Sequence, residues 1–417
     1  MIYGILSTIA FIIILPFWVI AGIFKPKLIA GFKQKCGFYN GLPILASSNS
    51  QALLFYGVSV GEVIAMENLI KKTRETFPHT NIILLTGTKT GQEIAHKKLS
   101  ETTDFISYFP FDFPFCINNM LKKLKPDAIF VAETELWPNF ANILHEQKIP
   151  LFIINGRISD RTYKSYKKLS FFFAPILRKY TNIFTQSQQD NDKLISIGAN
   201  PNTTTVMGNL KFDIKNPDTS SLGFEKNPQH KILIAASTHS GEDEIILETF
   251  SKLKNQFQNL KLILAPRHPE RNESVFNLIK KSGLASSKRS KNTDFEQNDI
   301  ILLDTMGELA KFYSICDMAF IGGSFNKTGG HNPLEATIFK KPIVSGPSTH
   351  NFKDIYSILT SSDAGKIVKT PQELQNHLYK LLSNENYYQK ASKDCETVFE
   401  QNQGALEFVI KVLQTLV

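Results

Sequence analysis

The feature that most constrains the fold is a repeated alternation of short apolar runs with segments of helical character. In the first series, the runs are apolar or β-branched and are bounded by polar residues, Gly or Pro; they cover residues 53–57, 81–86, 128–132, 150–155 and 182–186. Helix-like segments such as 61–76 and 91–99 lie between them. This alternation predicts an α/β fold, with a parallel sheet that has helices on both faces.

A second series of the same kind begins at His230, and its runs cover residues 231–236, 261–265, 299–303, 317–321 and 342–345. The stretch 213–228, rich in Asn, Pro, Ser, Gly and Lys, is the best linker candidate, and 285–298 is expected to be a polar loop. The sequence therefore predicts two Rossmann-like domains facing each other across a cleft, over residues 25–213 and 214–417, with the last helix able to pack on the first domain. Ligands are expected at the carboxyl ends of the strands.

The first 24 residues contain no charged side chain, and Lys25, Lys27, Lys33 and Lys35 follow them. The length is enough to cross a bilayer, so residues 1–24 are expected to form a membrane anchor helix. Pro16 and Gly22 interrupt the run, which leaves open a helix that lies in the membrane interface. The lysines after the helix predict an inner-membrane protein whose main body faces the cytoplasm.

The charge and the cysteine content of the chain limit the kinds of partner and site that it can have. The formal net charge of +9 favours an anionic partner, such as a phosphate-rich substrate, an anionic membrane or nucleic acid. The four cysteines lie far apart and form no CxxC pair, which argues against a structural zinc site and a disulfide framework. No nucleic-acid-binding module is visible, and the charge-free N-terminus favours lipid, so no nucleic-acid partner is expected.

Residues 322–335 (GGSFNKTGGHNPLE) form a glycine-rich turn between an apolar run, 316–321, and a predicted helix that starts at Leu334. Pro333 suits the first turn of that helix. Such a turn presents free backbone N–H groups and the positive end of a helix to a phosphate, although a purely structural turn is an equal alternative on this evidence alone. Polar residues also follow the other predicted strands. Their repeated position at one edge of each predicted sheet favours a functional site over a purely structural turn.

At this point the sequence resembles the Kdo (3-deoxy-D-manno-octulosonic acid) transferases of lipopolysaccharide synthesis, which are inverting glycosyltransferases of the GT-B fold. Nine ordered segments over nearly the whole chain carry the resemblance: SVGE (59–62), ETELWPN (133–139), NGRISDRTYKSY (155–166), QSQQDNDKLISIGA (186–199), GNLKFD (208–213), ASTHSGEDE (236–244), PRHPER (266–271), DTMGEL (304–309) and GGHNPLEA (329–336). The chain departs from the family at Gly57, where a His is frequent, and at Gly156, where an Ala is frequent.

The resemblance implies a donor, CMP-Kdo, and an acceptor, the lipid A precursor lipid IVA, with an acceptor-binding first domain and a donor-binding second domain. It implies Glu62 as the general base. The implied substrate-binding residues of the first half are Ser59, Gly61, Glu133, Glu135, Asn155, Arg157 and Lys211. Those of the second half are Ser237, Thr238, Arg267, His268, Met306, Gly307, Glu308, Gly329, Gly330, His331, Asn332 and Glu335.

These residue types suit the chemistry. A sugar hydroxyl is a poor nucleophile, so a carboxylate such as Glu62 must take its proton. Arg267 and the glycine-rich turn would stabilise the departing phosphate. Simpler interpretations remain beside these: Glu62 as a helix-capping charge, Arg267 in a surface ion pair, Glu335 as a plain first-turn carboxylate, and Met306 in the core. No cofactor or metal is expected, because the histidines 239, 268, 331 and 350 lack ligand spacing.

Residues 161–180 interleave cations with aromatic residues before Pro175 interrupts the segment. The segment suits contact with anionic inner-membrane lipids, and an amphipathic helix with a solvated basic face is an equal alternative. Two other functions stay open at this stage: a GT-B transferase that uses another nucleotide sugar on a lipid acceptor, and an inactive GT-B-like membrane assembly module.

Overall fold

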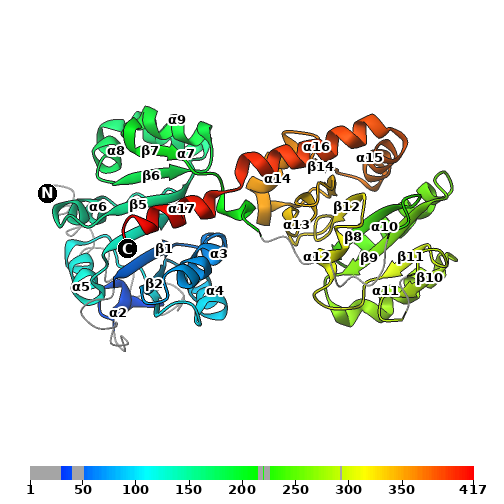
Figure 1. The fold of residues 1–417 in the computed structure, drawn as a ribbon, viewed down its shortest axis with the longest axis horizontal. Helices are drawn as coiled ribbons and strands as arrows, with labels where there is room; N and C mark the ends of the chain where they lie inside the picture. Colours follow the sequence, from blue (N-terminus) through cyan, green and yellow to red (C-terminus); the bar gives the residue numbers. More distant parts are fainter. Residues whose placement is uncertain (1–29, 40–50, 215–218, 220–225, 292–293) are drawn as a thin grey trace. The chain divides into compact units, whose positions relative to one another are not determined.

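The structure is a computed structural model, and it describes residues 30–39, 51–214, 219, 226–291 and 294–417 (Figure 1). The chain divides into two compact units: the part up to Asp213 together with Asn402–Val417, and Ile214–Gln401. The anchor helix predicted over residues 1–24 lies outside the described residues. No helix within the described ranges is long and apolar enough to cross a membrane.

The first unit is built on a seven-stranded parallel sheet with the order β3-β2-β1-β4-β5-β6-β7. Its strands are β1 (Ala52–Gly57), β2 (Asn81–Thr86), β3 (Phe105–Tyr108), β4 (Ala128–Ala132), β5 (Leu151–Gly156), β6 (Asn182–Thr185) and β7 (Thr204–Val206). Its helices are α2 (Phe32–Lys35), α3 (Val60–Thr76), α4 (Lys89–Leu99), α5 (Pro114–Leu124), α6 (Pro138–Glu146), α7 (Asp160–Lys168), α8 (Ser170–Leu177), α9 (Gln188–Ile197) and α17 (Ala405–Gln414), with the 3-10 turns η2 (Pro201–Thr203) and η3 (Leu210–Phe212).

Both faces of this sheet are covered by helices. Along β1, Leu53 and Phe55 pack with the side chains of α3, α4 and α17, whereas Leu54 and Tyr56 pack with those of α5, α6 and α8. Strands that are buried on both faces read as continuous apolar runs, which is why the sequence identifies them.

The last helix, α17, belongs to the first unit, where it packs against α3 (Figure 1). The carboxylate of Asp213 accepts hydrogen bonds of 2.7 Å each from the backbone N–H groups of Gly404 and Leu406. Acceptors at a helix start satisfy N–H groups that have no partner inside the helix. Burial raises the pKa of Asp213, and these two bonds lower it in part.

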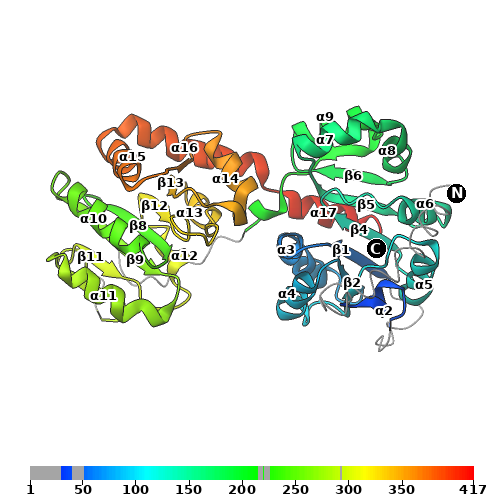
Figure 2. The ribbon, with the colours of Figure 1, turned by 180° about the vertical axis from the view of Figure 1, so that it is seen from behind.

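The second unit is built on another seven-stranded parallel sheet, with the order β10-β11-β9-β8-β12-β13-β14 (Figure 2). Its strands are β8 (Lys231–Thr238), β9 (Leu260–Pro266), β10 (Ser286–Lys288), β11 (Ile300–Leu302), β12 (Met318–Ile321), β13 (Ile343–Ser345) and β14 (Gly365–Ile367). Its helices are α10 (Glu242–Lys254), α11 (Asn272–Lys281), α12 (Leu309–Phe312), α13 (Leu334–Thr337), α14 (Lys353–Thr360), α15 (Pro371–Ser383) and α16 (Glu385–Asn402), with the turns η4 (Pro269–Arg271) and η5 (His350–Phe352).

Two predictions about local structure were wrong, and a third, the helix that starts at Leu334, was confirmed. The expected polar loop 285–298 contains β10, a three-residue strand at the sheet edge. The helix after Pro333, α13, is only four residues long, so it has a small dipole to offer an anion. The segment 161–180 breaks at Leu169, between α7 and α8, and Pro175 lies inside α8.

Candidate active site

Three glutamates gather at the carboxyl edge of the first sheet. β1 and β4 are neighbouring parallel strands, so the loops that follow them emerge side by side. Glu62 lies in the first turn of α3, which follows β1. Glu133 directly follows β4, and Glu135 comes two residues later. The prediction that polar residues gather at the carboxyl ends of the strands is therefore confirmed for the neighbouring strands β1 and β4.

Glu62 is only 8% exposed and is held within its own turn. Its Oε2 accepts a 2.5 Å bond from the N–H of Val58, and its Oε1 accepts a 3.0 Å bond from the hydroxyl of Ser59. Burial raises the pKa of Glu62, the charge of Glu133 raises it further, and these two bonds oppose the rise. A raised pKa makes the carboxylate a stronger base, and the two local bonds fix its orientation.

Glu133 occupies a strained backbone conformation, with φ of 57°. A non-glycine residue in the left-handed region costs about 1–3 kcal/mol and persists only where its surroundings impose it. Here the Nε of Arg157 donates to Glu133 Oε2 at 2.9 Å, and the hydroxyl of Thr134 donates to the carbonyl of Arg157 at 2.5 Å. These contacts tie the loop after β4 to the loop after β5.

Glu135 completes the group. Burial raises its pKa to about 7, and the neighbouring charges of Glu62 and Glu133 contribute to the rise. Its carbonyl accepts a 2.9 Å bond from the hydroxyl of Tyr180. Two carboxyl groups with raised pKa values at one strand edge form a site that can exchange protons near neutral pH.

One predicted residue of this unit, Asn155, has a different role from the one expected. Asn155 is 1% exposed, and its Oδ1 accepts a 3.0 Å bond from the N–H of Leu210, so its side chain supports the fold and does not reach a substrate in this structure. At Gly61 a side chain would meet only Ser59 Oγ, at 3.9 Å, so no close backbone approach requires a glycine there. Lys211 lies in η3 and is partly exposed.

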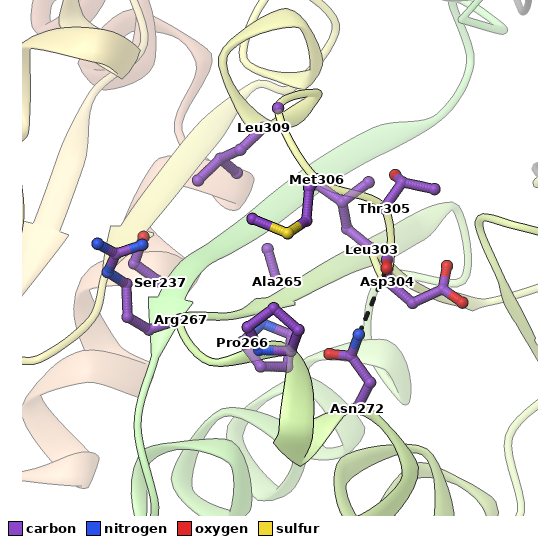
Figure 3. A pocket seen from close by; sticks show the side chains of 12 residues that line it. Ser237, Ala265, Pro266, Arg267, Asn272, Leu303, Asp304, Thr305, Met306 and Leu309 are labelled. Carbon is purple, nitrogen blue, oxygen red and sulfur yellow. Dashed lines mark hydrogen bonds between the residues drawn. The ribbon is translucent and has the colours of Figure 1, made fainter.

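In the second unit, a pocket of about 120 Å³ opens at the carboxyl ends of β8, β9 and β11 (Figure 3). Ala265, Pro266, Leu303 and Leu309 supply its apolar lining. Ser237, Arg267, Asn272, Asp304 and Thr305 add polar groups, and Met306 also lines the pocket. An apolar pocket with a few convergent polar groups is typical of a small-molecule site.

Arg267 is exposed, and like Ser237 it lines the pocket. Among the described residues it forms no ion pair, which contradicts the surface ion-pair alternative. Its positive charge and the hydrogen bond from Asn332 lower the pKa of Glu335, which burial raises more strongly. Arg267 is thus an unneutralised cation at the rim of the pocket.

The loop after β11 is held by ion pairing rather than by core packing. Met306 is 82% exposed, so the core alternative for this residue is wrong. Glu308 accepts from Arg289 at 3.1 and 3.2 Å and from the hydroxyl of Thr305. Burial would raise the pKa of Glu308, but Arg289 and Thr305 outweigh it and lower the pKa overall. Gly307 has a φ of 80° with open space around it.

The glycine-rich turn folds tightly. Gly329 and Gly330 have φ values of 100° and 76°, and a Cβ on Gly329 would lie 2.5 Å from the ring of His350. Glycine is required at this position for both reasons. Asn332 Oδ1 accepts a 3.1 Å bond from Leu334 N–H, and Asn332 approaches Glu335 at 3.5 Å.

Thr238 is completely buried, and its hydroxyl donates to Asp243 at 2.6 Å, so its predicted contact with substrate does not fit this structure. Asp243 also pairs with Arg271, which donates to the carbonyl of Thr238 at 3.0 Å. These residues support the loop that carries Ser237, whose φ of 55° is another strained non-glycine conformation.

The most important residue that sequence reasoning missed is Glu242. It is 1% exposed, and its carboxylate accepts bonds of 2.7–2.9 Å from four backbone N–H groups, those of His239, Gly323, Ser324 and Phe325. A single buried charge thus joins the loop after β8 to the glycine-rich turn after β12. Glu242 lies in the segment ASTHSGEDE, which carries part of the family resemblance, and this was the signal in the sequence that could have drawn attention to it.

Two histidines meet beside this carboxylate. The Nε2 atoms of His239 and His331 are 2.9 Å apart, and the rings stack with an interplanar angle of 12°. The ring of His268 packs edge-on against His239. Within the described residues, no group of three or more His, Cys, Asp or Glu side chains is arranged to hold a metal ion.

Comparisons with known proteins agree with this geometry. Residues 30–214 match the family model described as 3-deoxy-D-manno-octulosonic-acid transferase (kdotransferase). A 3-deoxy-D-manno-octulosonic acid transferase of Haemophilus influenzae is 33% identical over 409 residues, which cover 96% of this chain and 95% of the relative. The solved C-terminal CMP-Kdo binding domain of WaaA from Acinetobacter baumannii is 30% identical and covers 41% of this chain and 90% of its own, with a TM-score of 0.40.

The fold has a wider distribution. The UDP-GlcNAc 2-epimerase of Neisseria meningitidis, solved with UDP-GlcNAc, covers 88% of this chain and 100% of its own, with a TM-score of 0.54 and 14% identity. That likeness shows a GT-B-like fold and nothing about the substrate. The relationship with the Haemophilus influenzae enzyme, which extends over nearly both chains, shows the family: the chain belongs to the 3-deoxy-D-manno-octulosonic acid (Kdo) transferases, glycosyltransferases of lipopolysaccharide synthesis.

Proposed function

We propose that this enzyme transfers Kdo from CMP-Kdo to a hydroxyl of the lipid A precursor lipid IVA, with inversion at the anomeric carbon and with Glu62 as the general base. The observation that carries the proposal is the buried Glu62 carboxylate of raised pKa, oriented by Val58 and Ser59 at the strand edge. Family membership supports Kdo as the sugar.

In the proposed transfer, each bond that forms is matched by one that breaks, and Glu62 accepts the proton that is released. The acceptor hydroxyl oxygen bonds to the anomeric carbon of Kdo, the bond from that carbon to the phosphate oxygen breaks, and CMP leaves with the electron pair. Glu62 takes the hydroxyl proton as the new bond forms, which makes the oxygen a competent nucleophile. Burial and the charge of Glu133 raise the pKa of Glu62 and keep it basic, and Arg157 partly balances Glu133.

The donor is assigned to the second unit. The departing CMP gains negative charge on its phosphate, and a cation that is not already neutralised stabilises that charge best. Arg267 meets this description at the rim of the pocket, which Ser237 also lines. The apolar lining and the exposed Met306 suit the flat face of a nucleobase, and we assign Glu335, whose pKa is influenced by the charge of Arg267, to a hydroxyl of the donor.

Replacing Arg267 by Ala is expected to weaken CMP binding roughly ten- to a hundredfold, because a charge-assisted hydrogen bond contributes about 1.5–3 kcal/mol. Cytidine, which lacks the phosphate, should bind the variant nearly as well as the wild type. Calorimetric titration of the full chain with both ligands measures the difference. An equal loss for CMP and cytidine would show that Arg267 supports the pocket and does not contact the phosphate.

We also propose that the α7–α8 face of the first unit contacts anionic membrane lipids. Phe171 is 77% exposed and Leu169 is 47% exposed, where an isolated soluble domain would bury them. The exposed cations Arg161, Lys164 and Lys168 lie on the adjoining helix α7. Exposed apolar side chains flanked by cations are the pattern of an interfacial surface, and a lipid-linked acceptor requires one.

Replacing Lys164 and Lys168 together by Gln is expected to reduce the preference for anionic over neutral vesicles by roughly thirtyfold, because each lysine near such a surface contributes about 1 kcal/mol. Flotation with phosphatidylglycerol-containing and pure phosphatidylcholine vesicles gives that ratio, and the ratio cancels any common contribution from residues 1–24. The matched control replaces Lys280 and Lys281 of α11 by Gln. A ratio that changes equally in both variants would contradict the assignment to α7–α8.

A further inference from the structure

The stacked pair of His239 and His331 has no role in the function proposed so far. Their Nε2 atoms are 2.9 Å apart, which is hydrogen-bond distance. One Nε2 therefore carries a proton that it donates, and the other offers its lone pair. Each ring comes from a different loop: His239 follows β8, and His331 lies in the glycine-rich turn.

The surroundings hold the pair in place from two sides. Glu242 of α10 accepts the N–H of His239 at 2.9 Å and the N–H of Gly323 at 2.7 Å. Gly323 has a φ of 67°, and a Cβ there would lie 3.0 Å from the His331 ring, so the backbone passes directly under that ring. The two loops that carry the rings are therefore held together, which keeps the rings near each other.

The charges that face the pair are mostly positive. Arg267 and Arg271 belong to the segment after β9, which also carries the titratable ring of His268, and Glu242 is the opposing negative group. Burial lowers the pKa of His331 to about 4, with His239 and Arg267 as the next causes, and burial also lowers the pKa of His239. With the site empty, the pair is therefore neutral at physiological pH. An anion brought to this place would reverse the balance.

We propose that the His239–His331 pair is a proton-linked oxyanion clamp, which takes up one proton when the phosphodiester of the sugar nucleotide binds and then donates from both Nε2 atoms to that anion. The proposal rests on the assignment of the donor to the second unit. It gives a defined protonation change to His331, which the resemblance implies as a substrate-binding residue, and it adds His239, which the resemblance did not single out.

The proton count follows from the geometry. In the empty pair, a single hydrogen lies between the two Nε2 atoms. When a second proton arrives, both Nε2 atoms carry N–H groups that can no longer bond to each other, and each turns to an oxygen of the anion. The charge of the pair changes from 0 to +1, and it faces a ligand charge of −1. Because the bound state holds more protons, binding must strengthen as the pH falls.

The test uses the methyl ester of CMP, whose phosphodiester keeps one negative charge between pH 5.5 and 8, so that the ligand itself contributes no proton. Titration calorimetry of the full chain in buffers of different ionisation enthalpy gives the number of protons taken up. At about pH 6.5 we expect an uptake of roughly 0.5–1 proton, and a dissociation constant that rises with pH by up to about tenfold per unit. Cytidine, without the anion, should bind with an uptake near zero.

Variants separate a proton-linked role from a structural one. His331→Gln and His239→Gln should each abolish the uptake and flatten the pH dependence, whereas a purely structural loss would weaken binding equally at every pH. The matched control is His230→Gln, because His230 lies at the opposite end of β8 and burial also lowers its pKa. The control should keep the wild-type uptake.

The outcomes separate this inference from the proposed function. If the ester and cytidine both bind but no proton is taken up, the clamp is wrong and the donor assignment stands. If the uptake persists in both His239→Gln and His331→Gln, another group titrates and the clamp is also wrong. If neither the ester nor cytidine binds, both the donor assignment and the clamp are overturned.

Discussion

Replacing Glu62 by Gln should slow Kdo transfer about 100-fold or more, while the affinity for CMP stays at the wild-type level. The amide oxygen of Gln can still accept the bond from Val58 N–H, and its N–H₂ group can donate to the hydroxyl oxygen of Ser59, so the turn at the start of α3 should keep its shape. What the amide cannot do is take up a proton from the acceptor hydroxyl. The groups that we assign to the donor belong to the other unit, so we expect CMP binding not to change. Initial rates and calorimetric titration with CMP measure the two quantities.

Glu67→Gln is the matched control, because Glu67 lies on the same helix and pairs with Lys71 and Lys98 on the surface. Its turnover should remain close to that of the wild type. In the wild type, turnover should also fall as the pH drops through the raised pKa of Glu62, because the protonated acid cannot act as a base. Turnover of the Glu62→Gln variant within a fewfold of the wild type would remove Glu62 from the role of base.

Replacing Glu242 by Gln is expected to lower the melting temperature of the second unit by roughly 6–12 °C and to weaken CMP binding at the same time. The carboxylate accepts four backbone hydrogen bonds in a buried place, and the amide group of Gln turns an N–H₂ toward some of those donors. The loss of charge-assisted bonds and the new unsatisfied donors together cost about 3 kcal/mol. In a unit of this size, each kcal/mol shifts the melting temperature by about 2–4 °C.

Glu244→Gln controls for the loss of a negative charge from the same helix, because Glu244 is exposed in the first turn of α10. It should change the melting temperature by less than about 2 °C. Differential scanning calorimetry of both variants, with and without CMP, gives the comparison. Equal shifts in the two variants would show that Glu242 does not organise the loops that we assign to the donor.

The fold could be predicted where hydrophobic burial decides the structure. The ten strands predicted from apolar runs are all present, with ends displaced by no more than two residues. The four strands that were missed, β3, β7, β10 and β14, have three or four residues each, and all four lie at a sheet edge. Short edge strands such as Ser286–Lys288 are defined by pairing with a neighbour, and their own sequence carries no apolar signal.

The site could be predicted only in part, and the reason is that burial depends on tertiary contacts. Glu62 and Arg267 lie where strand ends predict them, at the edge of each sheet. Thr238 and Asn155 have the same sequence signal, but they are buried and bind the protein itself. Glu242 reads as an ordinary first-turn carboxylate, because its four partners include three from a turn more than eighty residues away.

The most direct test of the central claim is mass spectrometry of the lipid product after the full chain is mixed with CMP-Kdo and tetra-acylated lipid IVA. The account predicts a lipid heavier by one or more whole Kdo residues, formed together with CMP, and the mass also counts the residues added. UDP- and GDP-sugars in place of CMP-Kdo should leave the lipid unchanged. An unmodified lipid with CMP-Kdo, or a glycosylated lipid with one of the other nucleotide sugars, would contradict the account.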